Sequence, residues 1–184
     1  ELFTAAKDLP ITRVLECFAG LGVASEIIRA TWPLRYHKMA DASAECIAAL
    51  ENKFSGPGVY IRQENIHEAP FYPLALQGLV CLDFNTWTVL HWEEWRERLE
   101  ELFYWRPAAV QLTDTAVNKL HFHHARYAAL LGGECKTPEG YITGLSRWMF
   151  RHHRYSVRYA VWYHVAAYML LTPGEHHAEI WKLG

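Results

Sequence analysis

Two glycines, two acidic residues and an asparagine have the types and spacing of a nucleotide-binding site. Gly20 and Gly22 lie in Glu16-Cys-Phe-Ala-Gly-Leu-Gly22, after an apolar run and before a helical pattern. Glycine permits a tight turn and a close approach of the backbone to a ligand, and the following helix start presents N–H groups. Asp41 follows Gly22 by nineteen residues, where an acidic residue can accept hydrogen bonds from ribose hydroxyls. Asn65 stands after the next predicted strand and has an amide suited to an adenine edge.

Each of these residues also has a purely structural interpretation. The glycine turn could serve only to pack a helix, Asp41 could cap the helix that follows it, and Asn65 could be an ordinary turn residue. Position 25 is Ser, where the dinucleotide-binding fingerprint has its third glycine. A nicotinamide-dependent oxidoreductase is therefore a less favoured alternative.

The polar residues follow elements that alternate between strand and helix. Apolar runs of strand length predict five strands, at 11–17, 36–40, 59–62, 79–82 and 108–112. Apolar residues at helical spacing predict helices at 25–32, 43–54, 91–105, 117–131 and 137–153. Three more strands are predicted near the end, at 156–163, 167–172 and 179–183. This order predicts an α/β fold, a mostly parallel Rossmann-like sheet with helices on both faces and an antiparallel C-terminal edge. Ligands of such sheets bind at the carboxyl ends of the strands.

Length and composition indicate one domain over residues 1–184. The net charge of −2 is not the strongly basic balance typical of tight nucleic-acid binders. No apolar run is long enough for a membrane span, and the first residues do not resemble a secretory signal. The four cysteines are scattered and without a Cys-x-x-Cys pair, which favours reduced thiols in a cytoplasmic protein.

Three segments, in order and at normal spacing, resemble motifs of the class I S-adenosylmethionine (SAM)-dependent methyltransferases. Glu16–Gly22 resembles their glycine-rich first motif, Met39–Glu45 their acidic second-strand motif, and Ile61–Pro70 the third-strand segment that reaches the adenine. The resemblance runs over residues 11–115 and implies the fold and SAM as cofactor. Family members usually carry Asp at the position of Asn65, but an amide oxygen can also accept from an adenine amino group. The implied cofactor-binding residues are Glu16, Phe18, Gly20, Gly22, Asp41, Asn65 and Asp83.

By this resemblance, Gly20 and Gly22 would lie under the methionine part of SAM, with Asp41 at the ribose and Asn65 at the adenine. The sulfonium of SAM is a cation. Glu16 and nearby aromatic faces are therefore expected to stabilise it.

The segment Asp83-Phe-Asn-Thr-Trp87 stands where amino-methylating nucleic-acid enzymes carry Asn/Asp-Pro-Pro-Tyr/Phe. It has acidic, amide and aromatic groups but neither proline. The candidate catalytic residues are Asp83 or Asn85, which would orient the acceptor, and Trp87 or Phe84, which would stack on it. The two aromatic residues could equally be packing residues. A cytosine-C5 enzyme is disfavoured because Cys81 lies inside a predicted strand and no Pro-Cys pair follows it.

Histidines gather in three places, at 121–124, 152–153 and 176–177. His121 and His123 would point to different sides of a helix, and no carboxylate has the spacing of a zinc helix, so no metal site is predicted. With Lys119, Arg126, Arg147, Arg151 and Arg154 the histidines could form a basic face that contacts phosphates, or simply a solvated one.

The sequence therefore predicts a SAM-dependent methyltransferase, with a nucleic acid slightly preferred over a small molecule or a protein as acceptor. The alternative is a non-catalytic methyltransferase-like module that serves as a binding partner or scaffold. The two missing prolines, Asn65 and the lack of a target-recognition domain favour that alternative. The sequence leaves the oligomeric state open.

Overall fold

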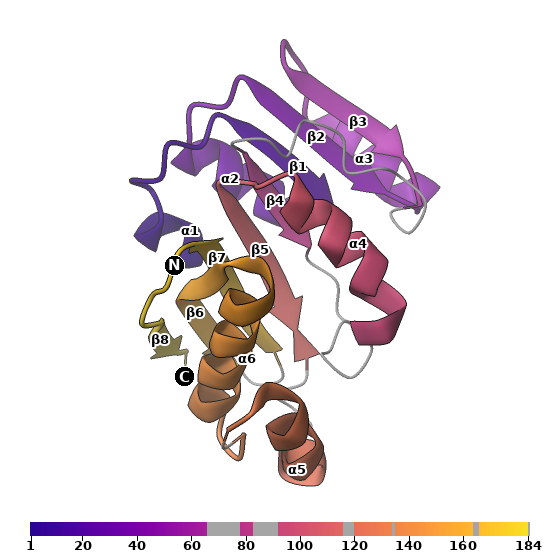
Figure 1. Cartoon of the computed structure of the whole chain (residues 1–184). Helices are drawn as coiled ribbons and strands as arrows, with labels where there is room; N and C mark the ends of the chain where they lie inside the picture. Colours follow the sequence, from indigo (N-terminus) through magenta and orange to yellow (C-terminus); the bar gives the residue numbers. More distant parts are fainter. Residues whose placement is uncertain (66–77, 83–91, 116–119, 134, 164–165, 184) are drawn as a thin grey trace. The chain divides into compact units, whose positions relative to one another are not determined.

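The computed structural model describes residues 1–65, 78–82, 92–115, 120–133, 135–163 and 166–183. It confirms the predicted α/β fold. Eight strands form a sheet in the order β3-β2-β1-β4-β5-β7-β6-β8 (Figure 1). The chain forms two compact units, which we describe separately. The N-terminal unit comprises Phe3–Asp83 and Glu101–Val110, and the C-terminal unit comprises Glu1–Leu2, Phe84–Glu100 and Gln111–Gly184.

Parallel strands and two helices make up most of the N-terminal unit. Its elements are β1 (Arg13–Cys17), α2 (Val23–Thr31), β2 (Tyr36–Asp41), α3 (Ala44–Lys53), β3 (Val59–Gln63) and β4 (Leu79–Leu82). β1 pairs in parallel with β2 on one side and with β4 on the other, and β2 pairs in parallel with β3. The strand order thus reverses at β1. In open α/β sheets, ligands bind beside the carboxyl ends of the strands at such a switch point.

α3 packs on β2 and β3 through a small apolar core. The buried residues of this core are Ala19, Met39 and Leu50, and Phe54 packs against them. Ala19 belongs to the glycine turn, so the same core that seats α3 also fixes the turn.

The C-terminal unit contains residues 111–114 of β5 (Ala109–Asp114) together with two helices and three strands. These are α5 (Leu120–Leu131), α6 (Pro138–His153), β6 (Tyr155–Tyr163), β7 (Ala166–Pro173) and β8 (Glu179–Lys182). α6 packs on α5 and on β6. Two helices fall outside this grouping because they contribute residues to both units, α1 (Leu2–Ala5) and α4 (Trp92–Tyr104).

The C-terminal strands contain the predicted antiparallel pair, β6 with β7. β8 differs, because it pairs in parallel with β6. The strand order explains this pairing. β5 occupies the other edge of β7, so β8 joins the sheet on the far side of β6. Among the described residues, no helix combines the length and apolarity needed to cross a membrane.

Candidate cofactor site at the glycine turn

The turn after β1 is held in a compact, left-handed backbone conformation. Phe18, Gly20 and Gly22 have positive φ angles of 62°, 55° and 78°. The amide of Ala19 donates to the carbonyl of Ala40 in β2 (3.0 Å), and the amide of Gly22 donates to the carbonyl of Ala19 (3.0 Å). α2 begins directly after Gly22, which provides no side-chain cap. The first N–H groups of α2 therefore lack a side-chain acceptor, a condition that favours polar ligands at a helix start.

The two glycines are required for different reasons. Within the part of the chain that the structure describes, a Cβ built on Gly20 has no neighbour within 4 Å, so no described residue fills the space above Gly20. A Cβ built on Gly22 would lie 2.6 Å from Phe54 Cε2 and 2.9 Å from Leu50 Cδ2. Gly22 therefore permits α3 to pack against the turn, whereas Gly20 leaves backbone accessible for close approach of a ligand.

Asp41 at the end of β2 connects the turn to α3. Its Oδ2 accepts from the amide of Gly20 (2.9 Å), and its Oδ1 accepts from the amide of Ser43 (2.9 Å). Ser43 caps α3, since its hydroxyl accepts from the amide of Cys46 (3.3 Å). Each carboxylate oxygen has a second lone pair. Half-buried Asp41 can thus hold the turn and still accept hydrogen bonds from a ligand hydroxyl.

Glu16 lies beneath the turn and is only 1% exposed. Its Oε2 accepts from the hydroxyl of Ser25 in α2 (2.7 Å) and lies 2.9 Å from His37 Nε2 in β2. Among the described residues, His37 Nδ1 is buried without a hydrogen-bond partner. The 2.9 Å distance fits a hydrogen bond in which His37 Nε2–H donates to Glu16. Glu16, Ser25 and His37 therefore connect β1, β2 and α2 below the turn.

Sequence reasoning did not identify Ser25 and His37 as partners of Glu16. Ser25 was recognised only as the residue that replaces a third glycine. The signal that could have found the cluster is the position of Glu16 in a strand of otherwise apolar residues, since a buried carboxylate requires donors.

The end of β3 approaches the same edge. The backbone amide of Glu64 donates to the carbonyl of Asp41 (3.0 Å), and the Glu64 carboxylate pairs with Lys38 (2.6 Å). Gln63 Nε2 donates to the carbonyl of Ala42 (3.1 Å). Asn65, the proposed adenine contact, is exposed and follows directly. The structure thus joins Gly20 to Asp41 by a hydrogen bond and places Asn65 just after the strand that pairs with β2.

The predicted acceptor segment lies outside the described residues. Asp83, Phe84, Asn85 and Trp87 all belong to it, so their catalytic and stacking roles remain predictions. β4, which ends directly before Asp83, is fully buried and pairs with β1.

A buried polar pair stands at the end of β5 in the C-terminal unit. The hydroxyl of Tyr141 in α6 donates to Asp114 Oδ2 (2.5 Å), and both side chains are fully buried. Burial, followed by the nearby Asp114 carboxylate, raises the pKa of Tyr141 well above its usual value. Tyr141 also packs edge-on against Tyr127 of α5. The pair fixes the start of α6 against β5, and sequence reasoning did not predict it.

Among the residues that the structure describes, no three His, Cys, Asp or Glu side chains gather closely enough to hold a metal ion. All four cysteines are thiols, with no disulfide between them.

The strand order and the turn at its switch point define a class, the Rossmann-like fold of the SAM-dependent methyltransferases. Solved structures with this fold align over most of the chain. The methyltransferase domain of bacterial CtHen1 aligns over 94% of each chain, with a TM-score of 0.58 and 12% identity. The magnesium protoporphyrin IX methyltransferase of Synechocystis PCC 6803, solved with bound SAM, aligns over 94% of this chain and 74% of its own (TM-score 0.56, 11% identity).

A third similar structure is an O-methyltransferase from neocarzinostatin biosynthesis, in complex with SAM and 2-hydroxy-5-methyl naphthoic acid. It aligns over 92% of this chain and 51% of its own, with a TM-score of 0.55 and 16% identity. No protein-family model matches the chain, and no curated protein matches it by sequence. At these identities the similarity establishes the fold.

Proposed function

We propose that the protein is a SAM-dependent methyltransferase with SAM as its cofactor. One observation carries the proposal: Asp41 holds the amide of Gly20 at the carboxyl end of β1, and no described residue lies within 4 Å of a Cβ built on that glycine. The fold of SAM-dependent methyltransferases over 94% of the chain supports it. Donors at a helix start and an acidic acceptor nearby suit a ligand with a carboxylate and ribose hydroxyls.

The residues of the turn fit this cofactor. Phe18, Gly20 and Gly22 would lie against its methionine part, Asp41 would accept from its ribose hydroxyls, and Asn65 would bond its adenine. Asp83, beyond β4, completes the proposed set. Glu16 contributes through the turn that it supports from below. SAM, when bound, supplies a methyl group on a cationic sulfur.

The chain's own residues then have mainly a positioning task. Methyl transfer is an in-line displacement, so the rate depends on holding the acceptor atom in line with the methyl group. Asp83 and Asn85 would orient the acceptor, and Trp87 would stack on it. Asp83 would act as a base only for an acceptor that must lose a proton.

We further propose a nucleic acid as the acceptor and the cytoplasm as the location. The residues from 111 onwards support the first, because they contain eight Lys and Arg against five Asp and Glu. The similar structures act on or bind quite different molecules, a porphyrin and a naphthoic acid, so the fold does not choose the acceptor. The four thiols support a reducing compartment.

Transfer of a labelled methyl group tests the activity. The protein is incubated with SAM labelled in its methyl group and with single-stranded RNA, single-stranded DNA or a small phenol. We expect label in one of the nucleic acids and much less label with Asp83→Ala, because that variant loses the proposed acceptor contact.

Label found only in the phenol would indicate a small-molecule acceptor in place of a nucleic acid. Binding of SAM without transfer to any acceptor would favour the alternative, a non-catalytic methyltransferase-like module.

A further inference from the structure

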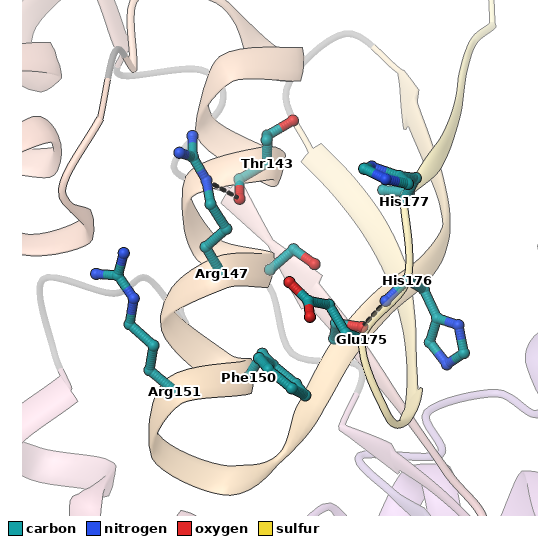
Figure 2. A pocket seen from close by; sticks show the side chains of 10 residues that line it. Thr143, Arg147, Phe150, Arg151, Glu175, His176 and His177 are labelled. Atoms are coloured by element: carbon teal, nitrogen blue, oxygen red, sulfur yellow. Dashed lines mark hydrogen bonds between the residues drawn. The ribbon is translucent and has the colours of Figure 1, made fainter.

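A cavity lies wholly within the C-terminal unit. It has a volume of about 760 Å³ and lies between α6 and the segment 174–178 that joins β7 to β8 (Figure 2). Cavities of roughly 300–1,000 Å³ hold small organic ligands. It shares no residue with the glycine turn. Its lining includes two arginines, two histidines, three hydroxyl side chains and one carboxylate.

The two arginines, against one carboxylate, give the described lining of the cavity a net positive charge. Arg147 and Arg151 stand one turn apart on α6, and both are exposed (Figure 2). Within the part of the chain that the structure describes, neither guanidinium forms an ion pair; Arg147 only donates through Nε to the carbonyl of Thr143 (3.5 Å). Like charges at this spacing on a helix are unfavourable. An anion between the two guanidiniums would remove the repulsion and satisfy their remaining donors.

Two serine hydroxyl groups also line the cavity. Ser146 is 5% exposed, and its Oγ accepts from the amide of Val157 (2.9 Å), which leaves its own O–H to donate. Ser156 is saturated, because its Oγ accepts from the amide of His176 (2.8 Å) and donates to the carbonyl of Gly174 (2.7 Å). These two bonds fix the segment 174–178, so the wall opposite α6 is built before any ligand binds.

The two histidines have different tasks. The ring of His176 points away from α6 and bonds the carbonyl of Pro173 (3.0 Å), so it secures the segment (Figure 2). The exposed ring of His177 points back toward Thr143 on α6 (Figure 2). His177 is therefore the histidine that can face a ligand.

Two further lining residues indicate more than a bare phosphate ion. Half-buried Phe150 adds an aromatic ring to the lining, and Glu175 is the one carboxylate among the described lining residues (Figure 2). An aromatic ring can pack against a nucleobase, and a carboxylate accepts hydrogen bonds from base N–H groups. The lining thus offers cations for a phosphate, and an aromatic ring and a hydrogen-bond acceptor for a base. A nucleotide has both of these parts.

We propose that this cavity binds a nucleotide, with its phosphate at Arg147 and Arg151 and its base beside Phe150 and Glu175. The nucleotide is either free or part of a nucleic-acid strand. The charge distribution supports an anionic ligand here, because residues 1–110 have an excess of five acidic residues while residues 111–184 have an excess of three basic ones.

Competition binding with the full-length protein tests the site. A fluorescein-labelled oligouridine is titrated by anisotropy in about 0.1 M salt, and unlabelled UMP and uridine compete with it. Uracil probes avoid the adenosine-binding role proposed for the glycine turn. We expect UMP to compete at least about ten-fold better than uridine, because only UMP brings the phosphate. Arg147→Gln/Arg151→Gln should weaken binding about ten-fold or more, whereas the exposed Arg126→Gln on α5 should leave it within about two-fold.

The two ligand sources give different results, and both support the site. A free nucleotide is indicated when UMP alone saturates the protein, and a strand is indicated when only the oligonucleotide binds, with an affinity that falls steeply with salt. Displacement of the oligouridine by uridine as readily as by UMP would overturn the proposal. So would a double variant that binds like Arg126→Gln. Because SAM is absent throughout, failure of this site is independent of methyl transfer.

Discussion

Glu16 is a buried carboxylate held by donors from two other elements. Ser25 of α2 and His37 of β2 meet at the same oxygen, and the His37 and Glu16 side chains are 0% and 2% exposed. A buried charge is costly unless it is paired and hydrogen-bonded. The three side chains therefore act as a unit that stabilises the base of the glycine turn.

Replacing only His37 should lower the free energy of unfolding more than replacing both Glu16 and His37. We expect His37→Leu to lower the free energy of unfolding by about 3–5 kcal/mol, because Glu16 would then remain buried without its histidine. The double variant Glu16→Met/His37→Leu should recover part of that loss, since no buried charge remains. Urea denaturation of the single and double variants measures both values. Losses that simply add would show that Glu16 and His37 are not coupled.

At the scale of the element, α6 connects the core of the C-terminal unit to its surface. Tyr141, Leu145 and Met149 are fully buried on one side, while Arg147 and Arg151 line the cavity on another. Near the end of the helix, burial and, to a smaller extent, neighbouring His152 lower the pKa of His153 to about 4, while Glu100 opposes the shift.

His153 should make the protein less stable in mild acid. Its pKa in the folded state lies below the ordinary value of about 6.5, so between about pH 6.5 and pH 4 the unfolded chain binds a proton that the folded protein does not. Stability is therefore lost as pH falls through this window. Between pH 7 and pH 5, the Tm of His153→Gln should therefore fall less than the Tm of the wild type. We expect a difference of about 2–4 °C, the shift that about 1 kcal/mol of stability gives at this chain length.

The exposed His177→Gln is the matched control for this comparison and should follow the wild type. Equal losses for the wild type and His153→Gln would contradict the assigned role.

The elements were largely predictable because their signals are local. Alternation of apolar runs with helical spacing located the strands and helices. The parallel pairing of β8 was not predictable, because it depends on β5 occupying the edge of β7. The Tyr141–Asp114 pair and the cavity beside α6 also escaped prediction, since residues distant in sequence meet there only in the fold.

For the whole molecule, the strand order matters most, because it brings the ends of β1, β2 and β3 to one edge beside the switch point. Asp41 and Gly20, 21 positions apart, form a hydrogen bond there. Spacing predicted that both residues belong to one ligand site but did not predict this hydrogen bond, and the separate tasks of Gly20 and Gly22 depend on α3, whose Phe54 and Leu50 leave no room for a side chain at Gly22.

Calorimetric titration of the wild type and Gly20→Asn with SAM tests the central claim most directly. Asparagine tolerates a left-handed φ better than other residues with side chains, and no described residue lies within 4 Å of a Cβ built on Gly20, so the variant should keep its Tm. Its side chain would occupy the space proposed for the cofactor. We predict that the wild type binds SAM with a Kd of about 1 μM and does not bind NAD. Gly20→Asn should bind SAM at least about ten-fold more weakly. No binding of SAM by the wild type, or equal binding by a folded Gly20→Asn, would contradict the account.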